Sequence, residues 1–124
     1  MKLETAFSMD TSSIKYGPGV TTEIGWDMEE QGSCRVMVVT DANLTESEAV
    51  MVTLESLRKH GIDAALFDQV RVEPTDISFK EAIKFAKDGN FDGFVAVGGG
   101  SSMDTAKAAN LYLSHPADFM TYVN

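Results

Sequence analysis

Two short apolar segments constrain the fold more than any other feature of this sequence. Val36–Val39 and Phe94–Val97 each hold four consecutive apolar residues, and valine supplies most of them. Such runs are typical of strands that are buried on both faces of a parallel sheet. Apolar residues elsewhere recur at helical spacing, as at Val50, Leu54 and Leu57. Strands and helices that alternate in this way predict an α/β fold, in which helices cover a parallel sheet.

The same periodicities, bounded by glycines, place the remaining elements. They predict a short strand over 14–16, helices over 20–31 and 45–60, a strand over 64–67, and helices over about 79–88 and 102–113. Thr45 is expected to cap the second helix, with Glu48 completing a capping box. A length of 124 residues and a hydrophobic fraction of 44% suit one domain with a packed core.

Charge, histidine and cysteine content argue against several kinds of partner. The net charge of −9 argues against nucleic acid and anionic membrane surfaces, and no apolar run is long enough to span a bilayer. No secretory or organelle signal is visible, and the single Cys34 suits a reducing compartment. We therefore expect a cytoplasmic protein, with the mitochondrial matrix as the alternative.

His60 and His115 lack a partner at helical ligand spacing, so no metal site is predicted from these residues.

Three glycines follow the second apolar run, where a strand should give way to a helix. In open α/β sheets, ligands lie outside the carboxyl ends of the strands. Gly98, Gly99 and Gly100 would let a pyrophosphate approach the backbone, and Ser101 would cap the next helix, with Asp104 at its third position. The alternative is a tight turn without a ligand, because the segment has neither G-x-G-x-x-G spacing nor a P-loop ending.

Asp41 follows the first apolar run and should lie at the same edge of the sheet. A carboxylate in this place accepts hydrogen bonds from both hydroxyls of an adenosine ribose and repels a 2′-phosphate. Asp41 therefore favours NAD over NADP as the cofactor. The alternative is that Asp41 only caps the turn that follows it.

The glycine segment belongs to a longer motif. Residues 98–107 (GGGSSMDTAK) resemble the G-G-G-S-x-x-D-x-x-K segment of the iron-containing (group III) alcohol dehydrogenases. Glycerol dehydrogenase and dehydroquinate synthase have more distantly similar segments. A closer resemblance, to the hydroxyacid-oxoacid transhydrogenase branch, runs from about residue 6 to 124 and rests on Val70–Asp76, Phe79, Glu81–Ile83, Val95–Ser101 and Lys107–Tyr112.

This resemblance implies a dehydroquinate synthase-like protein of two domains. The N-terminal one is a Rossmann-like NAD-binding domain, and the C-terminal helical one supplies an aspartate and three histidines to a divalent metal, iron or zinc. Residues 1–124 would be the N-terminal dinucleotide-binding domain, apparently truncated, with the metal ligands outside this chain. By position, the resemblance assigns cofactor binding to Asp41 on the adenosine ribose, to Gly99, Gly100 and Ser101 at the pyrophosphate, and to the motif residue Asp104.

Two motif positions keep open roles. Lys107 matches the motif lysine, but an exposed lysine paired with Asp104 three residues earlier fits its position equally well. Glu73 stands where many alcohol dehydrogenases of the family have a cofactor-binding asparagine. The transhydrogenase branch shares this glutamate, so Glu73 supports that branch and leaves its own contact undefined.

The resemblance also implies an activity. A hydroxy acid similar to 4-hydroxybutyrate would give hydride to bound NAD, and 2-oxoglutarate would take it back. One alternative is an ordinary iron-containing, NAD-dependent alcohol dehydrogenase. Another is a stand-alone nucleotide-binding module without catalysis, and residues 1–124 by themselves are expected to be inactive. The expected partner is a small hydroxy acid or alcohol, and the sequence leaves open whether the chain forms a homodimer.

Overall fold

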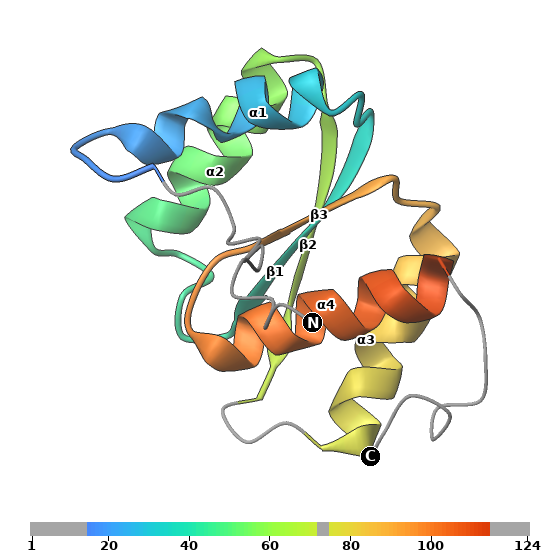
Figure 1. Cartoon of the computed structure of the whole chain (residues 1–124). Coiled ribbons are helices and arrows are strands. Elements are labelled where there is room, and N and C mark those ends of the chain that lie inside the picture. Colours follow the sequence, from blue (N-terminus) through green and yellow to red (C-terminus); the bar gives the residue numbers. More distant parts are fainter. Residues whose placement is uncertain (1–14, 72–74, 115–124) are drawn as a thin grey trace, which may run out of the picture.

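The computed structural model describes residues 15–71 and 75–114. A 3₁₀ turn, η1, precedes the first helix, and strands and helices then alternate along the chain (Figure 1). In order, the elements are η1 (Val20–Glu23), α1 (Ile24–Glu30), β1 (Arg35–Asp41), α2 (Glu48–Lys59), β2 (Asp63–Val70), α3 (Asp76–Gly89), β3 (Gly93–Ala96) and α4 (Gly100–Ser114). None of the described helices is long and apolar enough to cross a bilayer.

The three strands form one parallel sheet in the order β2-β1-β3. β1 is central: Val38 lies opposite Leu66 of β2 on one side and opposite Val95 of β3 on the other. Its residues from Val36 to Thr40 are fully buried, as the uninterrupted apolar run predicted. The α/β fold with a parallel sheet is therefore confirmed.

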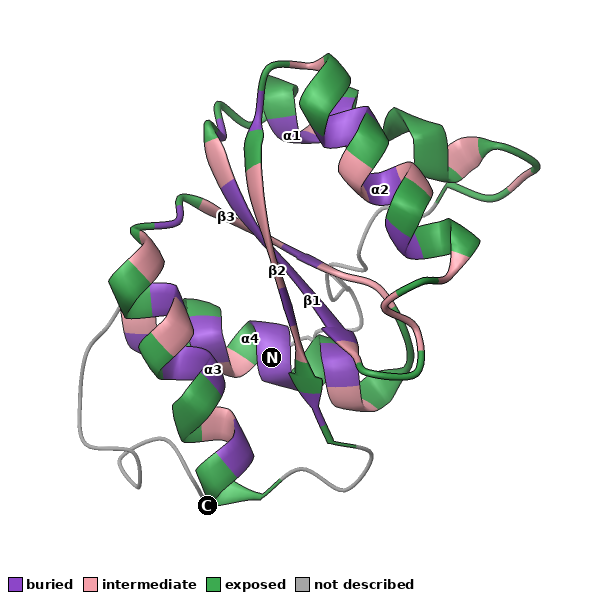
Figure 2. Cartoon of the chain, turned by 180° about the vertical axis from the view of Figure 1, so that it is seen from behind, coloured by how far each residue is buried: buried purple, intermediate pink, exposed green. Residues whose placement is uncertain are grey.

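Helices cover both faces of this sheet (Figures 1 and 2). Because successive side chains of a strand point to opposite faces, Val36 and Val38 pack towards α1 and α2, whereas Met37 and Val39 pack towards α3 and α4. The second face also holds an aromatic group, in which Phe85 stacks on Phe91 with ring centroids 5.7 Å apart. Two apolar layers therefore hold the central strand.

Three local expectations were wrong. Lys15 and Tyr16 are exposed and belong to no strand. Ser47, not Thr45, caps α2, because its hydroxyl accepts a hydrogen bond from the Val50 N–H. The last helix begins earlier than expected, at Gly100, so Ser101 lies within its first turn instead of capping it. The two helix starts differ from expectation by two residues each, which is the usual uncertainty of helix ends in sequence patterns.

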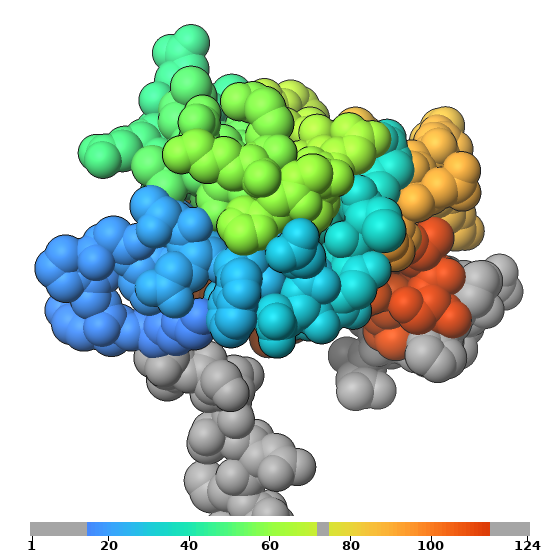
Figure 3. Space-filling model, turned by 90° about the horizontal axis from the view of Figure 1, so that it is seen from above, coloured from blue at the N-terminus to red at the C-terminus, as the bar shows by residue number. Residues whose placement is uncertain are grey.

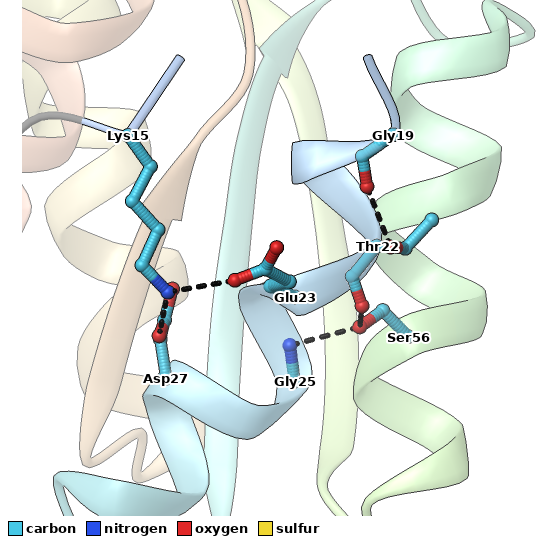
Figure 4. A network of polar contacts seen from close by, with 7 residues as sticks. All are labelled: Lys15, Gly19, Thr22, Glu23, Gly25, Asp27 and Ser56. Carbon is cyan, nitrogen blue, oxygen red and sulfur yellow. Dashed lines mark hydrogen bonds and ion pairs between the residues drawn. The ribbon is translucent and has the colours of Figure 1, made fainter. Parts of the chain in front are cut away.

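Helix α1 packs against α2 at Gly25 (Figure 4). Its N–H donates to the Ser56 hydroxyl at 2.9 Å, and that hydroxyl donates to the Thr22 carbonyl at 2.6 Å. A Cβ at Gly25 would overlap the Ser56 carbonyl oxygen and lie 2.7 Å from His60 Cδ2. The glycine is therefore required by the distance between the two helices, because any side chain would push them apart.

The amino end of the sheet is held by Asp92. Its carboxylate accepts hydrogen bonds from the Arg35 N–H at 2.9 Å and from the Cys34 N–H at 2.9 and 3.0 Å. The same carboxylate is exposed, yet the Arg35 and then the Cys34 N–H hold the pKa of Asp92 below its ordinary value. This contact joins β1 to the start of β3 at the end opposite to the glycine turn.

We expect Asp92→Asn to lower stability at neutral pH but not in acid. Because the pKa of Asp92 is lower in the folded state, its contribution is present above the unfolded pKa and is lost as the pH falls through the folded one. Because Asp92 is exposed, we expect the unfolding free energies of wild type and Asp92→Asn to differ by no more than about 1 kcal/mol at neutral pH. Urea unfolding measured between about pH 7 and pH 2 tests this, since the two unfolding free energies should converge in acid. A difference in unfolding free energy between wild type and Asp92→Asn that stays constant with pH would contradict the stabilising role of the Asp92 carboxylate.

Candidate functional site

The strand order changes direction between β1 and β3, although all three strands are parallel. From β1 it moves outward to β2 on one side and then returns to β3 on the other side. A crevice outside the carboxyl ends of two such strands is where open α/β sheets bind ligands. Val39 lies opposite Ala96, so Asp41 and Gly98 each lie two residues beyond this pair. The structure thus brings the predicted ribose and pyrophosphate residues to one edge.

The glycine turn contains two different kinds of glycine. Gly98 has a φ of 142°, and a Cβ there would lie 2.9 Å from Ser102 Oγ and 3.3 Å from Leu44 Cδ1. A Cβ at Gly99 or Gly100 would meet no atom of the described residues within 4 Å. Gly98 is therefore needed to form the turn, whereas Gly99 and Gly100 leave an open space above the start of α4.

Asp41 ends β1 and is half-buried. Its Oδ1 accepts a hydrogen bond from the Asn43 N–H at 2.8 Å, and its carbonyl accepts from the Leu44 N–H at 3.1 Å. Asp41 therefore does cap the following turn. This role uses one carboxylate oxygen, so both interpretations of Asp41 remain compatible with its geometry.

The other motif residues lie along the first two turns of α4. Gly99 supplies the carbonyl that accepts from the Met103 N–H at 3.1 Å, as the residue before a helix does. Ser101 is half-buried, while Asp104 and Lys107 are exposed. In this described helix Asp104 and Lys107 form no ion pair with each other, so that interpretation of Lys107 finds no support. Glu73 lies outside the described residues.

Two residues of the site escaped sequence reasoning. Thr40 is fully buried, and its hydroxyl donates to the Val97 carbonyl at 2.8 Å. Ser102 is 1% exposed, and its buried hydroxyl has no hydrogen-bond partner in the part of the chain that the structure describes. Polar groups that follow an apolar strand or a glycine run were the only available signals, and neither indicates which atom the group will meet.

A groove borders this edge on the side of α1 and α2. It has a volume of about 750 Å³ and is lined mainly by apolar side chains, with Lys15 and Asp27 at its rim. Its lining includes Val20, Ile24, Met28, Val95, Val97 and Gly98. Figure 3, seen from above, shows the blue N-terminal part of the described chain side by side with green α2. Lys15 is held there by Asp27 at 2.8 Å and Glu23 at 3.0 Å (Figure 4).

No metal centre is present in the part of the chain that the structure describes. Among those residues, no three His, Cys, Asp or Glu side chains lie close enough together to hold an ion. Cys34 is exposed, and His60 contacts only Glu29 among acidic groups, at 3.3 Å. His115 lies outside the described residues. The described residues therefore do not fit a metal site.

Fold and site together define a Rossmann-like α/β domain with its polar edge at the strand switch point. The family model for iron-containing alcohol dehydrogenase matches residues 11–124. The chain therefore belongs to the iron-containing alcohol dehydrogenase family, which is a family of enzymes. This confirms the resemblance seen in the glycine motif.

Relatives point to the same branch as the motif. The chain is 59% identical over 120 residues to the mitochondrial hydroxyacid-oxoacid transhydrogenase of Xenopus laevis, and 54% identical over 120 residues to that of Homo sapiens. In both comparisons 96% of this chain is covered, but only 26% of the relative. The chain thus spans about a quarter of the length of these relatives. Their names place them in mitochondria, so the expected cytoplasmic location finds no support.

Solved structures share the fold. The chain resembles 1,3-propanediol oxidoreductase with a TM-score of 0.79 and 32% identity, covering 82% of this chain and 27% of the other. It resembles NADH-dependent butanol dehydrogenase A from Thermotoga maritima with a TM-score of 0.85 and 26% identity, covering 93% and 29%. The Rossmann-like arrangement expected from the sequence is therefore confirmed.

Proposed function

We propose that the edge formed by β1 and β3 binds the ADP portion of NAD. The observation that carries this proposal is the open space over Gly99 and Gly100 at the start of α4, a helix of 15 residues, next to the carboxylate of Asp41. The helix dipole and the N–H groups at the start of a helix favour a phosphate in that space without a basic side chain.

Each residue has a defined task in this proposal. Gly99, Gly100 and Ser101 offer backbone N–H groups to the pyrophosphate, and Asp41 accepts from the adenosine ribose. Asp104 is exposed in the second turn of α4, because the helix begins at Gly100, so its assignment to the cofactor rests on its place in the motif. NAD, when bound, accepts a hydride from a hydroxyl-bearing carbon and returns it to a carbonyl carbon.

We further propose that the whole protein is a hydroxyacid-oxoacid transhydrogenase of the mitochondrial matrix. Residues 1–124 then form its N-terminal dinucleotide-binding domain, and the metal that the family implies is held outside the described residues. Support comes from identities of 54% and 59% to proteins with this name. The substrates would be a 4-hydroxybutyrate-like acid as donor and 2-oxoglutarate as acceptor.

Isotope transfer tests the activity. The whole protein of this proposal, not residues 1–124 alone, is supplied with donor acid deuterated on its hydroxyl-bearing carbon, a trace of NAD and 2-oxoglutarate. A transhydrogenase places the deuterium on the 2-hydroxy product without accumulating NADH. NADH that accumulates in the absence of 2-oxoglutarate would instead indicate an alcohol dehydrogenase that releases its cofactor, and no transfer at all would indicate a binding module.

Asp41 variants test the ribose assignment. Asp41→Asn keeps an acceptor for the Asn43 N–H but removes the negative charge, whereas Asp41→Gly removes both. We expect both variants to weaken NAD binding by about ten- to a hundred-fold, because a hydrogen bond to a charged group contributes about 1.5–3 kcal/mol. Both should also relax discrimination against NADP. The dissociation constants of the two cofactors check this, and an unchanged ratio would leave Asp41 as a turn cap only.

A further inference from the structure

We propose that Thr40 is a positioning residue that fixes the glycine turn for the pyrophosphate. This inference rests on the proposed binding of NAD. Thr40 is fully buried, directly before Asp41, and its Oγ1 donates to the Val97 carbonyl at 2.8 Å. The Val97 N–H in turn donates to the Val39 carbonyl at 2.9 Å. Val97 is thus held by β1 on both its N–H and its carbonyl, although it lies outside strand β3.

These two bonds set the direction in which the turn begins. The Val97 carbonyl and the Gly98 N–H share one peptide plane, and in a trans peptide they point in opposite directions. Because Thr40 draws the carbonyl towards β1, the Gly98 N–H faces away from β1. Gly98 then turns the chain with its φ of 142°, so the orientation of this single peptide determines where Gly99 and Gly100 lie.

A second contact couples the two halves of the site. Leu44 Cδ1 lies 3.3 Å from the place that a Cβ on Gly98 would occupy, and the Leu44 N–H donates to the Asp41 carbonyl at 3.1 Å. The turn that carries the ribose acceptor therefore packs directly on the turn that would receive the pyrophosphate. Thr40 directly precedes Asp41 and bonds to Val97, which directly precedes Gly98, so one buried hydroxyl joins the starts of the two turns that must contact one cofactor.

The alternative is that Thr40 only satisfies a carbonyl at the end of the sheet. Both roles predict some loss of stability when the hydroxyl is removed, because a buried carbonyl loses its donor. They differ in what happens to ligands. A positioning role changes the affinity for ligands that contain a pyrophosphate far more than the affinity for adenosine alone. A purely structural role changes both alike or neither.

The experiment compares Thr40→Val, which keeps the shape, with Thr40→Ser, which keeps the hydroxyl. Thr53→Val is the matched control, because Thr53 is also buried and lines the same groove as Gly98, but its hydroxyl donates to the Ala49 carbonyl within α2 and not to the glycine turn. The probes are ADP-ribose and adenosine, titrated into the full chain by calorimetry. Thermal unfolding of every variant is recorded in parallel.

We expect Thr40→Val to weaken ADP-ribose binding about tenfold, equivalent to one buried hydrogen bond, and to weaken adenosine binding less than about twofold. Thr40→Ser and Thr53→Val should bind ADP-ribose as the wild type does. Equal losses for both probes, or a loss in Thr40→Ser as large as in Thr40→Val, would overturn the inference.

If Thr40→Val does not fold, Thr40→Ser against Thr40→Ala makes the same comparison. If the wild type fails to bind ADP-ribose, the proposed function itself is wrong and this inference falls with it.

Discussion

Gly100→Ala should weaken NAD binding by about ten- to a hundred-fold without destabilising the protein. Its Cβ would enter the open space above α4, where no described atom lies within 4 Å, and would keep a pyrophosphate from the helix N–H groups. Each lost charge-assisted hydrogen bond contributes about 1.5–3 kcal/mol. The unfolding free energy should stay constant or rise by up to about 1 kcal/mol, because alanine is the better helix residue. Calorimetric titration with NAD and urea unfolding of the full chain measure the two effects.

Gly98→Ala is the contrasting variant. It should destabilise the protein by about 1–3 kcal/mol, since a φ of 142° is costly for alanine and its Cβ would crowd Ser102 and Leu44. The pair separates the two reasons for which the chain uses glycine here. If Gly100→Ala binds NAD normally, the glycine run is a turn without a ligand, and the pyrophosphate assignment fails.

Gly25→Ala should destabilise the fold by about 3 kcal/mol and leave the affinity of the folded protein for NAD unchanged. The added methyl group would overlap the Ser56 carbonyl oxygen, force α1 away from α2 and break the hydrogen bond from the Gly25 N–H to Ser56. A loss of this size lowers the melting temperature by roughly 10 °C. Differential scanning calorimetry of the full chain checks it.

Gly100→Ala also serves as the control for Gly25→Ala. Both add one methyl group to a glycine at or near the start of a helix, one where another helix is in contact and the other in open space. A melting temperature for Gly25→Ala within about 2 °C of the wild type would mean that α1 and α2 separate easily, contrary to the close contact.

The sheet was predictable because both apolar runs form parallel strands. The expected burial on both faces holds for the central strand β1, whereas β3 lies at the edge of the described sheet and is mostly half-buried. Four consecutive apolar residues are typical of a strand in a parallel sheet, and the helical spacing between Val36–Val39 and Phe94–Val97 indicated the alternation that defines the fold class. The edge at which Asp41 and the glycines meet follows from the same reasoning, since parallel strands end on the same side. These inferences need no knowledge of individual side-chain contacts.

The remaining features depend on contacts between distant segments. Nothing near Gly25 in the sequence indicates that α2 lies against it, and nothing near Thr40 indicates the Val97 carbonyl, 57 residues away. Ser47 caps α2 instead of Thr45. Both residues have hydroxyls that can cap a helix, so the sequence alone could not decide between them. Asp41 shows the same difficulty, since the sequence supports a turn cap and a ribose acceptor equally.

The central claim is that NAD lies at the edge formed by β1 and β3. Hydrogen–deuterium exchange of the full chain, measured with and without saturating NAD, tests the location directly. We predict slower exchange in peptides spanning 40–45 and 97–103, and no change around Asp92 at the opposite end of the sheet. Slower exchange confined to the groove beside α1, or to the Asp92 end, would contradict the account.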